Sequence, residues 1–127
     1  MDSNKYNVVL GITGGIAAYK IPELIRILQK SNMDIVPVVT KNACHFVTKT
    51  TLATLTGVEP LDDERIFSST HVPHLSIVEQ PSVLVIAPAT ANIIAKCANG
   101  IADDFLSTAF LSFSGPKLIV PAMHTEM

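Results

Sequence analysis

Residues 84–108, LVIAPATANIIAKCANGIADDFLST, organise the rest of this chain. The stretch opens within a short apolar run at 83–87, which predicts a buried strand that ends at Pro88. Small and hydroxyl-bearing residues come next at 89–92, then a helical pattern, a break at Gly100 and a second helix that starts near Asp103. An open α/β sheet binds ligands where loops follow its strand ends, so this loop is expected to face a flat, phosphate-bearing cofactor.

Short β-branched runs alternate with helical patterns along the chain. Strands are predicted at residues 7–12, 34–39, 83–87 and 117–120, and helices at 16–30, from about 43, around 52–55, at 92–98 and at 103–112. Residues 58–73 are expected to form a loop, and 74–79 one helical turn. Pro37 removes a ladder donor, so the second strand is expected near a sheet edge or locally irregular. The alternation predicts an α/β fold with right-handed crossovers and a mostly parallel sheet.

Length and composition indicate a single domain, residues 1–127. Hydrophobic residues make up 48% of the chain and charged residues 16%, which fits a buried parallel sheet or a domain that hides surface in an oligomer. A net charge of −2 without basic blocks argues against nucleic acid or an anionic membrane as partner. No apolar run could span a bilayer and the polar N-terminus is unlike a signal peptide, so a cytoplasmic location is expected.

Three loops are expected to meet along one edge of the sheet. They are Thr13-Gly14-Gly15, Thr40-Lys41-Asn42 and Ala89-Thr90-Ala91-Asn92. Each offers backbone N–H groups at a helix start with a hydroxyl or an amide, which can hold a phosphate without many cations. The glycine pair alone lacks the full G-x-G-x-x-G pattern and fits a tight turn equally well. No acidic residue follows the second strand to hold a ribose diol, which favours a mononucleotide such as FMN over NAD.

The histidines and cysteines offer few further candidates. His45 is expected to be partly buried and structural, whereas His74 fits either a structural position or a role as acid, base or anion partner. His124 follows the last strand, at the ligand edge. Cys44 and Cys97 are expected to be small buried residues, and their spacing indicates a reduced intracellular protein. The histidines lack companion ligands at suitable spacing, so no metal site is predicted.

Several motifs together resemble one family, the homo-oligomeric flavin-containing cysteine decarboxylases. They are GITGGIAAYK at 11–20, the Thr40 loop, His74-Leu75, APATAN at 87–92, GIADDFLST at 100–108 and PAM at 121–123. The resemblance covers nearly the whole chain and is greatest to the phosphopantothenoylcysteine decarboxylase part of the bifunctional coenzyme A biosynthesis protein. It implies a Rossmann-like flavoprotein fold in a three-layer sandwich, FMN as cofactor, and assembly as a homotrimer or dodecamer.

The resemblance also implies an activity, the decarboxylation of 4'-phosphopantothenoylcysteine to 4'-phosphopantetheine in coenzyme A biosynthesis. This carboxy-lyase reaction includes a redox step that belongs to the cofactor, while the protein supplies orientation and electrostatics. His74 matches the family's active-site histidine and is the expected catalytic residue. His124 and Met123 are expected to bind the substrate. The residues expected to contact FMN are Gly14, Gly15, Ile16, Thr40, Asn42, Thr90, Ala91, Asn92 and Ala122.

Two departures from the family pattern leave alternatives open. His124 stands where the family has an asparagine that holds the substrate carboxylate, and an imidazole N–H can donate one hydrogen bond there. The chain ends at Met127, before the family's substrate clamp and its cysteine, so it is expected to be truncated. One alternative is therefore a flavin-binding module that is non-catalytic or performs only the first half-reaction. Another is a related flavin prenyltransferase or peptidyl-cysteine decarboxylase.

Overall fold

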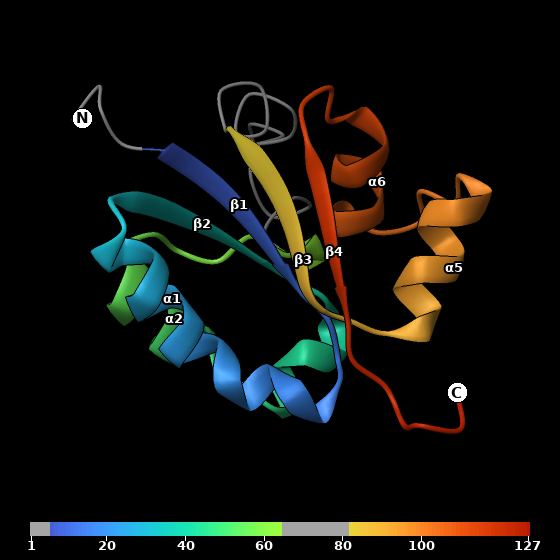
Figure 1. Cartoon of the computed structure of the whole chain (residues 1–127), viewed down its shortest axis with the longest axis horizontal. Helices are drawn as coiled ribbons and strands as arrows, with labels where there is room; N and C mark the ends of the chain where they lie inside the picture. Colours follow the sequence, from blue (N-terminus) through green and yellow to red (C-terminus); the bar gives the residue numbers. More distant parts are fainter. Residues whose placement is uncertain (1–5, 65–81) are drawn as a thin grey trace.

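A parallel sheet forms the centre of the protein (Figure 1). The computed structural model describes residues 6–64 and 82–127. In this part of the chain the strand order is β2-β1-β3-β4, and each neighbouring pair is parallel. The strands are β1 (Tyr6–Ile12), β2 (Met33–Val39), β3 (Val83–Ala89) and β4 (Lys117–Pro121). The predicted α/β fold with a mostly parallel sheet is confirmed.

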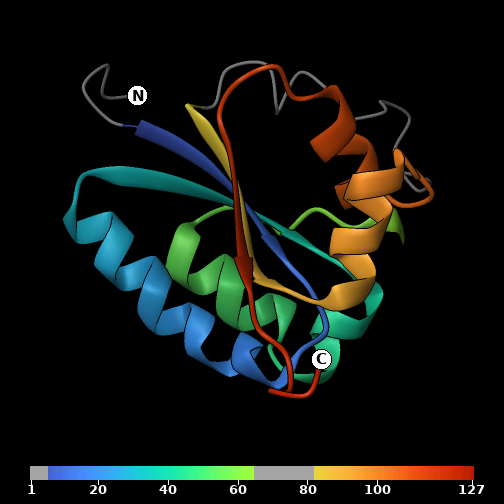
Figure 2. The ribbon, with the colours of Figure 1, turned by 45° about the vertical axis from the view of Figure 1, so that its right-hand side comes forward.

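Helices lie on both faces of the sheet and make the three layers visible in Figures 1 and 2. They are α1 (Ile21–Lys30), α2 (Lys49–Thr56), α5 (Ala91–Asn99) and α6 (Phe105–Ser112). Among the described residues, no helix has both the length and the apolar character needed to cross a membrane.

The core is divided into two parts by the central strand β1. Its side chains alternate between the two faces, so Leu10 packs with Ile25 under α1 while Val9 packs with Leu106 under α6. From Val8 onward every residue of β1 is buried. Packing against both cores holds β1 in place, and this fixes the position where the loop after β1 begins.

The helix predicted at 16–30 is two elements in the structure. Residues Ile16–Lys20 form a 3-10 helix, η1, and α1 begins only at Ile21. Pro22 lies in the first turn of α1. A proline has no N–H to donate and its ring crowds the preceding turn, so an α-helix starts most easily around it.

A second 3-10 helix, η2 (Lys41–His45), occupies the position of the helix predicted from about residue 43. The short turn presents Cys44 and His45 to solvent. The predictions that Cys44 is buried and that His45 is partly buried are wrong. Cys97, on α5, is partly buried and packs against the core beneath α6.

Pro37 lies on β2, the edge strand of the described sheet. Leu61 forms an isolated bridge outside β2: its N–H donates to Pro37 O at 2.9 Å and its carbonyl accepts from Val39 N at 2.9 Å. The N–H and C=O of one strand residue point to the same side, so the missing N–H of Pro37 lies on this outer side. The ladder between β2 and β1 loses nothing, and the predicted edge position is confirmed.

Strand β3 extends past the break predicted at Pro88 and ends at Ala89. The Ala87–Pro88 peptide is cis. The ladder between β3 and β4 shifts register between Ile86 and Ala89, where the proline has no N–H to donate. The ladder resumes beyond it, since Ala122 N donates to Ala89 O at 3.1 Å. Strand β3 therefore ends two residues later than predicted, and the loop after it starts at Thr90.

Candidate functional site

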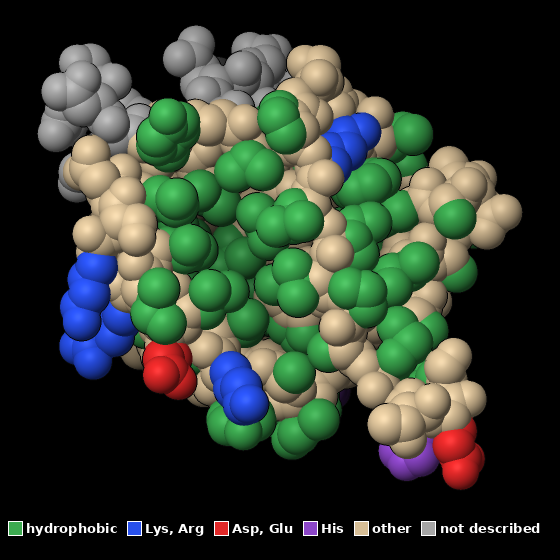
Figure 3. Space-filling model, viewed as in Figure 1, with side chains coloured by type: hydrophobic (Ala, Val, Ile, Leu, Met, Phe, Trp, Pro, Cys, Tyr) green, Lys and Arg blue, Asp and Glu red, His purple; other side chains and the backbone are tan. Residues whose placement is uncertain are grey.

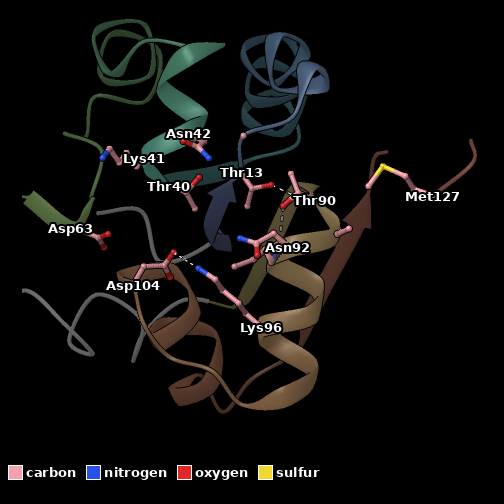
Figure 4. Close-up of a pocket in the computed structure, with 13 residues that line it drawn as sticks. Thr13, Thr40, Lys41, Asn42, Asp63, Thr90, Asn92, Lys96, Asp104 and Met127 are labelled. Atoms are coloured by element: carbon pink, nitrogen blue, oxygen red, sulfur yellow. Dashed lines mark hydrogen bonds and ion pairs between the residues drawn. The ribbon is translucent and has the colours of Figure 1, made fainter. Parts of the chain in front are cut away.

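The loops after β1, β2 and β3 meet at the carboxyl edge of the sheet (Figure 4). We call residues 13–15 the first loop, 40–42 the second loop and 90–92 the third loop. Between them lies a cavity of ≈ 450 Å³, a size typical of small-molecule sites. This polar cavity is lined by Thr13, Gly14, Thr40, Lys41, Asn42, Asp63, Thr90, Ala91, Asn92, Ile93, Lys96, Asp104 and Met127. The predicted meeting of the three loops is confirmed.

A second cavity, of ≈ 530 Å³, adjoins the first at the start of α5. The two cavities share Thr90, Ala91 and Met127. Most side chains around the second cavity carry only hydrocarbon or thioether groups, so we call it the apolar cavity. Its lining is Gly15, Ile16, Ala17, Thr90, Ala91, Ala122, Met123, His124 and Met127. The two cavities therefore lie next to each other, one with a polar lining and one with an apolar lining.

The first turn of α5 presents hydrogen-bond donors to the polar cavity. Thr90 is the N-cap, and its Oγ1 accepts from Ile93 N at 3.3 Å. The backbone N–H of Thr90 donates to Thr13 Oγ1 at 3.1 Å. Among the described residues, none accepts from the N–H groups of Ala91 and Asn92. Those two donors lie at the positive end of the helix dipole and line the cavity, so the turn can hold an anion.

Gly14 brings the first loop against the second loop. A Cβ built on Gly14 would lie 2.4 Å from Asn42 Cβ and 2.9 Å from the Asn42 carbonyl carbon, so no side chain fits there. Gly15 differs, because its Cβ would meet only Thr90 Cγ2, at the ordinary distance of 3.7 Å. Of the two glycines, Gly14 is therefore the one that the approach of the loops requires.

An ion-pair cluster lies along another wall of the polar cavity. Lys96 Nζ is 2.9 Å from Asp103 Oδ1 and 3.5 Å from Asp104 Oδ2. The hydrogen bond to Asp103 raises the pKa of Lys96, and the same bond lowers the pKa of Asp103. Asp104 is also the N-cap of α6 and accepts from Ser107 N at 2.8 Å. The prediction of acidic residues at this helix start is confirmed for Asp104, the N-cap, whereas Asp103 forms an ion pair with Lys96.

The residues predicted for the site fall along the two cavities. The polar cavity includes Gly14, Thr40, Asn42, Thr90, Ala91 and Asn92, and the apolar cavity includes Gly15, Ile16, Ala122, Met123 and His124 as well as Thr90 and Ala91. His74, the predicted catalytic residue, lies outside the described residues.

His124 lines the apolar cavity and can act there as a hydrogen-bond donor. Its Nδ1 accepts a hydrogen bond from Glu126 N at 3.3 Å. We infer that the neutral ring then carries its proton on Nε2. The side chain can therefore donate one hydrogen bond to an acceptor such as a carboxylate.

Sequence reasoning placed Thr13 in the first loop without assigning it a contact and did not single out Asp63, Lys96 or Met127, yet all four line the polar cavity. Thr13 carried a signal, a hydroxyl directly before the glycine pair. Asp63 carried none, since it lies in the weakly patterned stretch from residue 58. Within residues 6–64 and 82–127, no three His, Cys, Asp or Glu side chains gather closely enough to hold a metal ion.

Comparisons with known proteins point in one direction. A family model described as Flavoprotein matches residues 1–127. The coenzyme A biosynthesis bifunctional protein CoaBC of Mycobacterium tuberculosis is 39% identical over 120 residues, which are 94% of this chain and 28% of that protein. The CoaBC protein of Haemophilus influenzae is 38% identical over 130 residues, 100% of this chain and 32% of that protein. The chain thus spans about a third or less of these curated relatives.

Two solved structures share the fold closely. The FMN-dependent cysteine decarboxylase TvaF from thioviridamide biosynthesis superposes with a TM-score of 0.92 at 26% identity, covering 98% of this chain and 77% of that chain. A PPC decarboxylase mutant complexed with pantothenoylaminoethenethiol superposes with a TM-score of 0.86 at 32% identity, covering 96% of this chain and 69% of that chain. Both share the α/β architecture described above.

Proposed function

The chain belongs to the flavoprotein family of flavin-containing cysteine decarboxylases, and from that premise we propose that it binds FMN and decarboxylates 4'-phosphopantothenoylcysteine. The observation that carries the proposal is the junction of the polar and apolar cavities at the start of α5. A flavin mononucleotide has a phosphate at one end and a flat ring system at the other. The polar cavity matches the phosphate, and the adjoining apolar cavity matches the ring system.

The polar cavity fits the phosphate. The N–H groups of Ala91 and Asn92 lie at a helix start, where phosphates are commonly held. Thr40 and Asn42 add a hydroxyl and an amide from the opposite side of the cavity. Gly14 keeps the first loop close enough to share the same anion. In this proposal the phosphate is held by these neutral donors and by Lys41, because Lys96 is already paired with two carboxylates.

The apolar cavity fits the ring system. Ile16, Ala122 and Met123 present hydrocarbon and thioether surface, which stabilises a flat aromatic group by removing it from water. Ile16 is 71% exposed in the isolated chain. Burial of so large an apolar side chain by a ligand or by a second subunit would be favourable. In this proposal the ring therefore lies between Ile16 and the segment after β4.

The reacting end of the substrate would lie near His124. When bound, FMN supplies the two-electron redox chemistry that makes loss of carbon dioxide possible. The chain's own contribution is to orient the substrate, and His124 Nε2–H can donate to its carboxylate. His74 is proposed as the catalytic residue that orients the reacting end. Met123 would contact the substrate from the same wall of the cavity.

The proposed assembly is a homotrimer or a dodecamer of the same chain. Figure 3 shows a broad apolar face over the sheet. On β4, Leu118 is 54% exposed and Val120 is 43% exposed. Large apolar patches and uncovered edge strands usually mark interfaces between proteins. Sedimentation that gives a flavin-bound monomer would contradict this assembly.

A second candidate function is decarboxylation of a peptidyl cysteine. The observation that favours it is the similarity to a solved structure of the peptidyl-cysteine decarboxylase EpiD, with a TM-score of 0.81 at 27% identity. A flavin-binding module that completes only the oxidative half-reaction, and a flavin prenyltransferase, are further alternatives. These functions share the cofactor and differ in substrate and product, so the products separate them.

The test starts from protein freed of any flavin. Titration with FMN, followed by flavin absorbance and fluorescence, should give saturable binding at one site per chain. The loaded protein is then offered 4'-phosphopantothenoylcysteine or a peptide with a C-terminal cysteine, and products are identified by mass spectrometry. Phosphopantetheine supports the proposal. A decarboxylated but oxidised thiol means the half-reaction only, turnover of the peptide alone supports the second candidate, and absence of FMN binding removes all of them.

A further inference from the structure

Thr13 joins the first loop to the end of β3 through three hydrogen bonds. Its Oγ1 donates to Pro88 O at 2.6 Å and accepts from Thr90 N at 3.1 Å. Its backbone N–H donates to the same Pro88 O at 3.3 Å. The side chain is 2% exposed, so these bonds are shielded from water. Figure 4 shows Thr13 beside Thr90, on the wall of the polar cavity.

These hydrogen bonds connect β1 and β3 beyond the last residue pair of the ladder between the two strands. Pairing between β1 and β3 is recorded from Val8 with Val83 to Gly11 with Ile86. The other neighbour of β3 is also irregular here, because the register with β4 shifts between Ile86 and Ala89. In the described part of the chain, the bonds of Thr13 are the connection between the first loop and the end of β3 beyond that point.

We propose that Thr13 is a positioning residue for the phosphate-binding end of the site. By holding Thr90 N and Pro88 O, its hydroxyl sets where α5 begins and so where the N–H groups of Ala91 and Asn92 point. The same residue precedes Gly14 in the chain, so one anion meets donors from both loops at once. The identity of that anion as the FMN phosphate rests on the proposed function.

The hydroxyl is the essential part of this side chain in the proposal. Valine has the same shape without the hydroxyl, so Thr13→Val should leave Thr90 N without its acceptor and remove one donor from Pro88 O. Serine keeps the hydroxyl and loses only the methyl group. Thr13→Ser should therefore restore what Thr13→Val loses, whereas a purely space-filling role would give the opposite order.

A matched control exists at the far end of α2. Thr56 Oγ1 also donates to a backbone carbonyl, Leu52 O at 2.8 Å, and accepts from a backbone N–H, Val58 N at 3.1 Å. Thr56 lines neither cavity. Thr56→Val thus removes the same kinds of hydrogen bond without touching the site.

The experiment compares FMN titrations of the flavin-free wild type, Thr13→Val, Thr13→Ser and Thr56→Val at a temperature where all four are folded by circular dichroism. We expect the Kd for FMN to rise about tenfold or more in Thr13→Val, and to stay within about threefold of wild type in the other two. Wild-type affinity in folded Thr13→Val would overturn the proposal. Equal loss in Thr13→Ser would overturn the role of the hydroxyl.

A second readout needs no cofactor and separates this proposal from the proposed function. Amide hydrogen exchange of Thr90, measured by NMR in the flavin-free protein, should be about tenfold faster in Thr13→Val than in wild type, and unchanged in Thr56→Val. Unchanged exchange at Thr90 would overturn the coupling between the loops. If the wild type fails to bind FMN but the exchange of Thr90 is faster in Thr13→Val as expected, the proposed function is wrong and the coupling between the loops stands.

Discussion

The carboxylate of Asp63 accepts a hydrogen bond from the backbone N–H of Phe105, with 2.7 Å between Oδ1 and N. Phe105 is the first residue of α6, where backbone donors lack partners within the helix. Asp104 serves the same helix start as its N-cap. Two carboxylates from distant parts of the chain therefore stabilise α6, and both line the polar cavity. The start of α6 is one wall of the site because of this arrangement.

The cap on α6 can be tested by substitution of Asp104. Asp104→Ala should lower the free energy of unfolding by about 1 kcal/mol, because Ser107 N loses its acceptor and the capping box is broken. Asp104→Asn should retain most of the stability, since an amide oxygen also caps a helix. Urea denaturation of the flavin-free protein measures both changes. Asp103→Ala is the control, and a larger loss there would mean that the ion pair with Lys96 outweighs the cap.

The two glycines of the first loop should respond differently to alanine. Gly14→Ala should destabilise the protein by about 1–3 kcal/mol, because the new Cβ would collide with the backbone and Cβ of Asn42. It should also weaken FMN binding by moving the first two loops apart. Gly15→Ala should keep near-wild-type stability, since only Thr90 Cγ2 lies near. Thermal denaturation and FMN titration of both variants measure this, and equal losses would contradict the assigned role of Gly14.

The proposed catalytic role of His74 predicts a separation of binding from chemistry. His74→Asn should bind FMN with unchanged affinity, because His74 is proposed to act on the substrate and other residues are proposed to hold the cofactor. Decarboxylation should be lost if the imidazole orients the reacting end of the substrate. Flavin titration and product analysis, run on the same preparation, measure the two effects. Unchanged turnover would remove His74 from the mechanism.

The Lys96 cluster predicts a pH dependence of stability. The hydrogen bond from Lys96 lowers the pKa of Asp103 below its usual 3.8. A carboxyl group with a lowered folded-state pKa adds stability above its unfolded-state pKa and loses it as the pH falls through the folded-state value. Lys96, whose pKa is raised above 10.5 by Asp103, adds stability below that pH and loses it in stronger alkali.

The variant that tests this dependence is Lys96→Met, which keeps most of the length of the side chain and removes the charge. We expect Lys96→Met to be less stable than wild type near neutral pH. The difference should shrink as the pH falls through the lowered pKa of Asp103, and again as the pH rises through the raised pKa of Lys96. Urea midpoints in acid, near neutral pH and in strong alkali measure it. A difference that stays constant with pH would assign the effect to packing of the lysine stem instead.

Local patterns in the sequence were enough for the strands, the layers and the meeting of the loops. Hydrophobic residues recur every two positions in a strand and every 3.6 in a helix. This pattern lies within a short stretch of sequence, so β1 and α5 could be recognised without knowledge of the elements they pack against. The edge position of Pro37 followed from its missing N–H. Two of the errors occurred at prolines. Pro22 delayed the start of α1, and β3 passed through Pro88 because its ladder with β4 could shift register.

By itself, the sequence determined the α/β fold and the residue types gathered at the carboxyl edge of the sheet, because these depend on local periodicity and on motifs of a few residues. Only the tertiary structure decided how that edge is held together. Thr13 reaches Pro88 and Thr90 across 75 and 77 positions, and Asp63 reaches Phe105 across 42. No local pattern specifies such bonds. Each can form only when the strands are paired and the carboxyl ends of β1 and β3 lie side by side.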